Sequence, residues 1–254
     1  MNFFSDNCLG GGIYLITGAS SGIGKATAQL VALYGGKVIL SGRDNTKLEE
    51  VKNGLWGEGH HISQMNLKEL DGVSEWIKKL SLEYGPFSGI FHAAGMEFVK
   101  PIRMIKQVQL NEIFESSIFS AFGIAKAISQ KGVMVEGGAL IFMSSVAGSS
   151  GQVGMSAYSS AKASIDGLVR SLSVELANKK IRVNSIVAGA VNTEMHQRLI
   201  RSLDDVAISN YEKLHLLGFG EPNDISNAVI FLLSPASKWI TGTSMIVDGG
   251  YLAK

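Results

Sequence analysis

Short runs of apolar residues, many of them β-branched, recur along the chain and alternate with longer stretches of mixed polarity. The apolar runs lie at residues 13–17, 37–41, 61–65, 89–93, 139–144, 182–187 and 244–248. The stretches between them repeat apolar positions at helical spacing, as in residues 24–35 and 73–85. The pattern predicts strands and helices that alternate throughout the sequence.

Runs that are apolar along nearly their whole length are typical of strands covered on both faces. Each connection is long enough for a helical crossover, which joins parallel strands. We therefore predict an α/β fold, a doubly wound sheet of about seven parallel strands with helices on both faces. A chain of 254 residues without repeat or linker fits a single domain over residues 1–254. The one irregular region, about 194–220, follows a strand end and is predicted to be a substrate lid.

Composition excludes several classes of partner. The net charge is +1 and no dense Lys/Arg cluster occurs, so neither nucleic acid nor a membrane surface is indicated, and a small-molecule partner is expected. The single cysteine, Cys8, has no partner for an intramolecular disulfide, and no Cys/His cluster has metal-ligand spacing, so no metal is predicted. No apolar run approaches the length of a membrane span, and we expect a cytoplasmic protein.

A glycine-rich turn follows the first predicted strand. It reads "TGASSGIG", with Gly18, Gly22 and Gly24 where the strand passes into a helix. Glycines let backbone N–H groups approach a pyrophosphate, and the helix N-terminus offers unpaired donors to that anion. A bare glycine pattern is often only a turn, but its position at the start of an alternating chain favours a Rossmann-type dinucleotide site.

The end of the second predicted strand indicates which dinucleotide binds. NAD-binding proteins place an acidic residue there for the ribose hydroxyls, whereas this chain has Gly42 followed by Arg43. A guanidinium is suited to bidentate contact with a 2′-phosphate, so NADP(H) is the predicted cofactor. Asp44 leaves an alternative open, because it could neutralise Arg43 or bind the ribose itself.

Tyr158 and Lys162 are the catalytic candidates. Residues four apart share one face of a helix, and a nearby ammonium favours the phenolate form of a tyrosine. Ser145 ends a predicted strand at the sheet edge where open α/β proteins bind ligands, and its hydroxyl could bind a substrate carbonyl. By spacing alone the Tyr-Lys pair is weak evidence, because most such pairs are incidental neighbours on a helix face.

Six segments in order resemble the short-chain dehydrogenase/reductase family. They are "TGASSGIG" 17–24, "HAAG" 92–95, "SSVAG" 144–148, "YSSAK" 158–162, "RVNSIVAGAVNTEM" 182–195 and "ITGTSMIVDGG" 240–250. The resemblance implies that Ser145 polarises a carbonyl, that Tyr158 transfers the proton, and that Lys162 lowers the pKa of the tyrosine and holds the nicotinamide ribose. The cofactor-binding set that we predict is Gly18, Ser20, Ser21, Gly22, Ile23, Gly24, Arg43, Asn66, Leu67, Ala93, Ala94, Gly95, Tyr158, Lys162, Val191 and Thr193.

The chain departs from the family pattern at three places. His92 and Ala93 stand where the family has a pair of asparagines, and Asn66 stands where it has an aspartate. Ser117 aligns with the fourth catalytic residue, an asparagine that holds a water beside the lysine, although Ser116 is adjacent and the alignment could be one position off. A serine has a shorter reach than an asparagine, so we expect activity that survives but is reduced, with Ser117 kept as a catalytic candidate.

Two functions of different class follow. The first is an NADP(H)-dependent oxidoreductase that acts on a carbonyl or secondary alcohol, a ketone reductase of the 3-oxoacyl-thioester type. The second is an NADP(H)-binding regulator or scaffold with weakened catalysis, which Ser117 and the altered "HAAG" segment motivate. The family resemblance also implies a homotetramer, with interfaces from a helix at about 108–131 and another that begins near Ser156.

Overall fold

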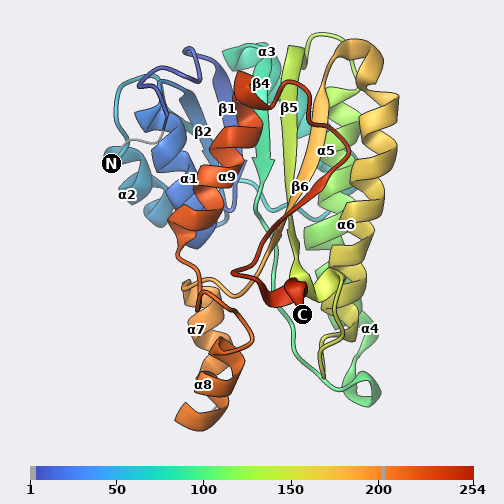
Figure 1. The fold of residues 1–254 in the computed structure, drawn as a ribbon. Helices are drawn as coiled ribbons and strands as arrows, with labels where there is room; N and C mark the ends of the chain where they lie inside the picture. Colours follow the sequence, from blue (N-terminus) through green and yellow to red (C-terminus); the bar gives the residue numbers. More distant parts are fainter. Residues whose placement is uncertain (1–3, 202–203) are drawn as a thin grey trace.

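Seven parallel strands form one sheet in the order β3-β2-β1-β4-β5-β6-β7 (Figure 1). The computed structural model describes residues 4–201 and 204–254. The strands are β1 (Ile13–Thr17), β2 (Lys37–Ser41), β3 (His61–Ile62), β4 (Phe87–His92), β5 (Met134–Ser145), β6 (Arg182–Ala188) and β7 (Ser244–Val247). The predicted fold class, a doubly wound parallel sheet, is confirmed.

The boundaries of five strands differ from the prediction, and the differences are largest at β3 and β5. β3 ends at Ile62 rather than at residue 65, and its residues are only partly buried because it is the edge strand. The chain nevertheless continues beside β2, since the Ser63 amide donates to Leu40 at 2.9 Å and the Met65 amide donates to Gly42 at 3.2 Å. β5 begins at Met134, earlier than its apolar run, and its register against β4 shifts between the pairs Phe87–Met134 and Gly89–Ala139.

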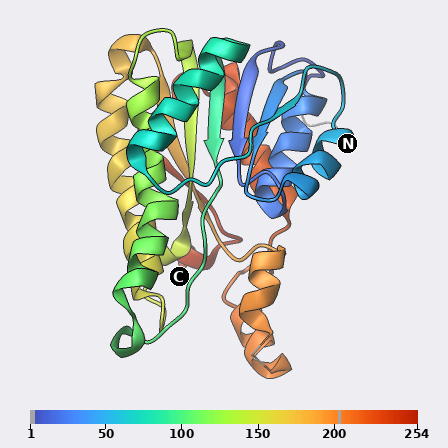
Figure 2. The ribbon, with the colours of Figure 1, turned by 180° about the vertical axis from the view of Figure 1, so that it is seen from behind.

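Helices cover both faces of the sheet. One face carries α1 and α9, which pack against each other, together with α2 (Figure 1). The other face carries α3, α5 and α6 (Figure 2). The helices are α1 (Gly22–Leu33), α2 (Asn45–Asn53), α3 (Leu70–Tyr84), α4 (Gln107–Phe114), α5 (Ser120–Ile128), α6 (Ser156–Glu175), α7 (Glu194–Ile200), α8 (Asp205–Glu212) and α9 (Pro222–Leu233).

The helix predicted at about 108–131 is interrupted. A π-helical turn, Glu115–Phe119, joins α4 to α5. The chain is therefore helical from Gln107 to Ile128, but the number of residues per helical turn changes in the middle. A π turn inserts one extra residue and rotates the side chains that follow it, and such turns are frequent at functional sites. Ser116 and Ser117 both lie in this turn.

The parallel register brings the carboxyl ends of the central strands to one edge of the sheet. Thr17 of β1 pairs with His92 of β4, and Ser145 of β5 pairs with Ala188 of β6. The predicted lid lies beyond this edge: α7 and α8 project from it in Figure 1, with residues 202 and 203 of the lid outside the described residues. The structure therefore places the lid segment and the motif-bearing strand ends at the same end of the molecule.

Within residues 4–201 and 204–254, no helix is both long enough and apolar enough to cross a membrane. In the same ranges, no group of three or more His, Cys, Asp or Glu side chains is arranged to hold a metal ion.

Candidate active site

A cavity of about 520 Å³ opens at the carboxyl edge of the sheet. The glycine turn and the ends of β2 and β4 line one part of it, and Ser145, α6, α7 and α8 line the other. Every residue of the predicted cofactor set contributes to the lining: Gly18, Ser20, Ser21, Gly22, Ile23, Gly24, Arg43, Asn66, Leu67, Ala93, Ala94, Gly95, Tyr158, Lys162, Val191 and Thr193. Segments that are far apart in the sequence thus meet in one cavity.

The turn before α1 has the shape that a pyrophosphate requires. Gly18 has a φ of +66°, and a Cβ on it would lie 2.9 Å from the Ala94 amide nitrogen. A Cβ on Gly24 would lie 2.2 Å from the Gly18 carbonyl oxygen, so only glycine lets the helix begin this close to the strand. The side chain of Ser21, the N-cap residue, makes no capping hydrogen bond, which leaves the first amides of α1 to an anion.

Arg43 lines the cavity just beyond β2, and the structure shows what Asp44 does. Asp44 is the N-cap of α2, where its carboxylate accepts a 3.2 Å hydrogen bond from the Lys47 amide. Among the residues that the structure describes, no ion pair joins Asp44 to Arg43. The arginine is therefore not neutralised by its neighbour and remains available to an anion.

Tyr158 and Ser145 meet in the cavity. The Ser145 hydroxyl accepts a hydrogen bond from the Ala147 amide at 3.2 Å. The pKa of Tyr158 is raised, chiefly by burial and also by the charge of Glu97, whereas a hydrogen bond with the Ser145 hydroxyl lowers it. The net direction is opposite to the lowering that the sequence leads us to expect from Lys162. At neutral pH the phenol is therefore protonated, which is the form that donates a proton to a carbonyl oxygen.

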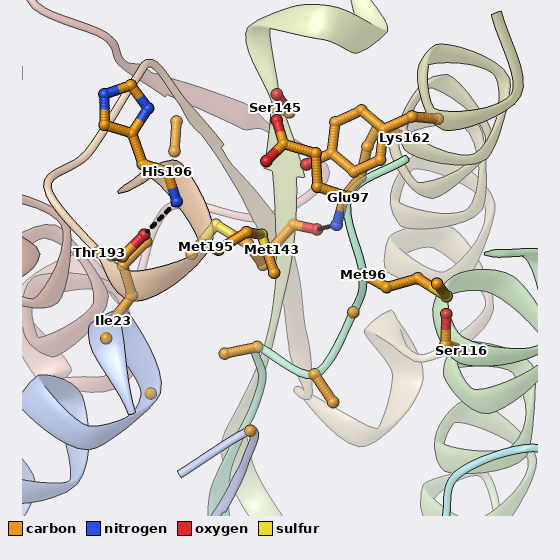
Figure 3. Close-up of a pocket in the computed structure, with 18 of the residues that line it drawn as sticks. Ile23, Met96, Glu97, Ser116, Met143, Ser145, Lys162, Thr193, Met195 and His196 are labelled. Carbon is orange, nitrogen blue, oxygen red and sulfur yellow. Dashed lines mark hydrogen bonds between the residues drawn. The ribbon is translucent and has the colours of Figure 1, made fainter. Parts of the chain in front are cut away.

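Lys162 lies one helical turn beyond Tyr158 and is almost fully enclosed. Its Nζ donates to the Met143 carbonyl oxygen at 2.9 Å (Figure 3) and lies 5.6 Å from the centre of the Tyr158 ring. Burial lowers the pKa of Lys162 to about 8, and the charge of Asp166 opposes that effect. The lysine is thus a cation near neutral pH, close to the phenol whose ionised form it would stabilise.

Asp166, which the sequence analysis missed, lies a further turn along α6. Asp166 is 9% exposed, and its carboxylate accepts hydrogen bonds from three serine hydroxyls. Ser185 and Ser244 donate to Oδ1 at 2.8 and 3.0 Å, and Ser144 donates to Oδ2 at 3.1 Å. The sequence did contain a signal for Asp166. It follows Tyr158 and Lys162 at intervals of four residues, which places all three on one face of the helix.

The structure separates the two serines of the π turn. Ser116 lines the cavity, and its side chain lies beside Met96 in Figure 3. The Ser117 hydroxyl is buried and has no hydrogen-bond partner among the described residues. A catalytic part for Ser117 therefore stays a prediction.

Three histidines near the cavity are buried rather than solvated. His92 joins two elements, since its Nδ1 bonds Thr17 at 2.8 Å and its Nε2 bonds Ser120 at 2.9 Å, and burial lowers its pKa to about 3. His196 of α7 and His215, which follows α8, are 6% and 3% exposed. Both pack against the rings of Tyr211 and Phe219, so an aromatic cluster fixes the lid residues.

The doubly wound sheet, the glycine turn and the Ser-Tyr-Lys arrangement define a dinucleotide-binding α/β oxidoreductase. The chain belongs to the short-chain dehydrogenase/reductase family, whose members act on CH–OH and carbonyl groups: a family model described as enoyl-(acyl carrier protein) reductase matches residues 18–252.

Characterised relatives match nearly the whole chain. The 3-oxoacyl-[acyl-carrier-protein] reductase FabG of Escherichia coli is 30% identical over 240 residues, which are 94% of this chain and 97% of the relative. The 3-oxoacyl-[acyl-carrier-protein] reductase of Mus musculus is 32% identical over 236 residues, which are 92% of this chain and 95% of the relative.

Two solved structures show the same fold. A short-chain type dehydrogenase/reductase from Mycobacterium ulcerans has a TM-score of 0.86 and 28% identity, with 95% of this chain and 90% of that chain covered. A blue fluorescent protein from a metagenomic library, solved in complex with NADPH, also has a TM-score of 0.86, with 97% of this chain and 100% of that chain covered. At 22% identity it supports the fold alone.

Proposed function

We propose that the protein is an NADP(H)-dependent reductase of a ketone, working from the cavity at the carboxyl edge of the sheet. The observation that carries the proposal is the meeting of Ser145, Tyr158 and Lys162 in the cavity that the glycine turn also lines. The names of the relatives point to 3-oxoacyl thioesters as one substrate class. Arg43, unpaired beside the cavity among the described residues, favours NADP(H) over NAD(H).

The side chains supply what carbonyl reduction needs besides the hydride, which NADPH provides when bound. Two hydroxyl groups, those of Ser145 and Tyr158, lie together and can both donate to one carbonyl oxygen. As the carbon is reduced, that oxygen takes the proton of Tyr158, and the charge left on the phenolate is stabilised by the Lys162 ammonium. The hydrogen bond from Lys162 to Met143 holds the ammonium at the sheet end of the cavity.

The proposal is tested by assaying the purified protein with NADPH and a broad panel of ketones. The panel contains acetoacetyl thioesters, diketones, keto sugars and simple ketones. Oxidation of NADPH with any member supports the reductase. Tight NADPH binding in a fluorescence titration, with no turnover on the whole panel, would instead support the regulator or scaffold that the sequence leaves open.

Arg43 gives a prediction about cofactor choice. Replacing Arg43 with alanine is expected to raise the KM for NADPH by about 10- to 100-fold, because a charge-assisted hydrogen bond to the 2′-phosphate contributes about 1.5–3 kcal/mol. The KM for NADH, which has no 2′-phosphate, should change little. Steady-state kinetics with both cofactors measures the effect, and an equal rise for both would mean that Arg43 does not contact the 2′-phosphate.

Ser117 gives a prediction about proton supply. Replacing Ser117 with asparagine is expected to leave turnover unchanged or to raise it, because the longer amide can hold a water near Lys162 that the buried serine does not reach. The matched change Ser116→Asn tests the neighbouring position, which already lines the cavity: a gain of turnover there and not at Ser117 would place the catalytic position at Ser116. A large loss of turnover for Ser117→Asn, with NADPH still bound, would show that Ser117 has a part of its own.

The lid and the assembly are part of the same proposal. Residues 194–220 would close over the substrate, and Met195, Arg198 and Tyr211 of this segment already line the cavity. A homotetramer is supported by apolar side chains on the predicted interface helix, where Phe119 and Phe122 are 44% and 45% exposed.

A further inference from the structure

Glu97 is an acidic side chain of the cavity that the proposed reaction does not use. Glu97 follows β4 by a few residues, lines the cavity and is only partly exposed. Figure 3 shows its side chain extending toward Ser145. Among the described residues, the Glu97 side chain makes no hydrogen bond and no ion pair.

The surroundings of Glu97 make this arrangement costly unless a ligand completes it. Burial raises the pKa of Glu97 to about 7, and the charge of Arg198 from the lid opposes that effect without forming an ion pair. The charge of Glu97 in turn raises the pKa of both Tyr158 and Tyr211, so the carboxyl group lies near both phenol groups of the cavity. A partly buried carboxyl group that no protein group satisfies can bind a hydrogen-bond donor of the substrate.

We propose that Glu97 accepts a hydrogen bond from a hydroxyl group that the substrate carries on the carbon next to its reacting carbonyl. The inference rests on the proposed function, because Ser145 and Tyr158 then fix the carbonyl oxygen and Glu97 extends toward the same point. The site would thus select hydroxyketones over ketones whose neighbouring carbons bear only hydrogen or alkyl groups.

The other charges of the cavity decide between a hydroxyl and an ammonium as the donor. Lys162 and Arg198 line the same cavity, and a cationic substrate would be repelled by both. A neutral hydroxyl satisfies the Glu97 carboxylate without that repulsion. The proposed substrate is therefore a neutral hydroxyketone rather than an aminoketone.

Three isosteric ketones test the inference: hydroxyacetone, aminoacetone and butanone. With NADPH and the full-length protein, kcat/KM for hydroxyacetone should exceed that for butanone by at least about 10-fold, as expected where a site binds a substrate hydroxyl. Replacing Glu97 with leucine should bring the ratio of the two close to one, and Glu97→Gln, which keeps a neutral acceptor, should give an intermediate ratio. Glu75→Gln, on an exposed position of α3, is the matched control and should leave the ratio at its wild-type value.

The outcomes separate this inference from the proposed function. The proposed role of Glu97 is overturned if butanone and hydroxyacetone are reduced equally well, or if Glu97→Leu keeps the preference while still binding NADPH. In either case the proposed reductase function is unaffected. A preference for aminoacetone over hydroxyacetone overturns the choice of a hydroxyl. If no ketone is reduced at all, it is the proposed function that fails.

Discussion

Replacing Tyr158 with phenylalanine is expected to lower turnover of any ketone that the protein reduces by about 10²- to 10⁴-fold, the usual contribution of a positioned general acid. The phenol is the group that burial keeps protonated and that meets the Ser145 hydroxyl, so its loss removes the proton donor while the ring keeps its place above Lys162. NADPH binding, followed by fluorescence, should be retained. Rapid assays at saturating NADPH measure the loss of kcat.

A second tyrosine of the cavity provides the control for this change. Tyr211 lies in α8 and also lines the cavity, and burial raises its pKa to about 12. Its replacement by phenylalanine should reduce turnover far less, because Tyr211 does not share the Ser145 hydrogen bond. If both variants lost activity equally, the proton would not come from Tyr158 in particular; if neither did, another donor would serve the reaction.

The sheet could be predicted from the sequence because its signal is local. Each of β1, β2 and β6 is a run whose residues are almost all buried, so hydrophobicity alone marks it. β3 was overestimated because an edge strand is buried on fewer sides, and its hydrogen bonds to β2 continue after its regular geometry has ended. The cofactor turn could be predicted because its glycine pattern is local in the sequence, although Gly18 is also required by a contact with Ala94, which is distant in the sequence.

Other features depend on contacts that are distant in the sequence and left no local pattern. The burial of His215 is an example, because this histidine accepts a 3.0 Å hydrogen bond from the Ala190 amide and packs on the ring of Tyr251. The π turn around Ser117 changes which serine lines the cavity, and no spacing rule for an α-helix foretells one inserted residue. The sequence identifies Glu97 only as a glutamate after β4. That it lines the cavity, without an ion-pair partner among the described residues, follows only from the structure.

Asp166 carries the second large prediction, because it connects the stability of the fold to the charge of Lys162. Replacing Asp166 with asparagine removes the buried charge and turns an amide NH₂ toward serine hydroxyls that now donate to a carboxylate. The cost is expected to be about 1–3 kcal/mol, as for a hydrogen-bonded buried group that loses its partner. For a protein of this size that corresponds to a fall in Tm of roughly 2–12 °C, measurable by thermal unfolding.

The same change should move the pH dependence of turnover. The charge of Asp166 raises the pKa of Lys162 against the effect of burial, which brings that pKa to about 8. Without that charge the pKa falls further, so Lys162 loses its proton at lower pH and no longer stabilises the phenolate. The decline of kcat on the alkaline side should therefore begin at lower pH in the variant than in the wild type.

An aspartate on the surface separates this effect from a general loss of stability. Asp71 pairs with Lys126 at 2.6 Å, and both side chains are largely exposed, so Asp71→Asn should change Tm little and leave the pH profile of kcat in place. If Asp166→Asn lowered Tm but left the alkaline limb unmoved, Asp166 would be a structural residue only. An alkaline limb shifted to lower pH, with NADPH affinity retained, would establish Asp166 as the residue that positions Lys162 and keeps it protonated. Unsatisfied serine hydroxyls alone would destabilise the fold but would not change the pKa of the lysine.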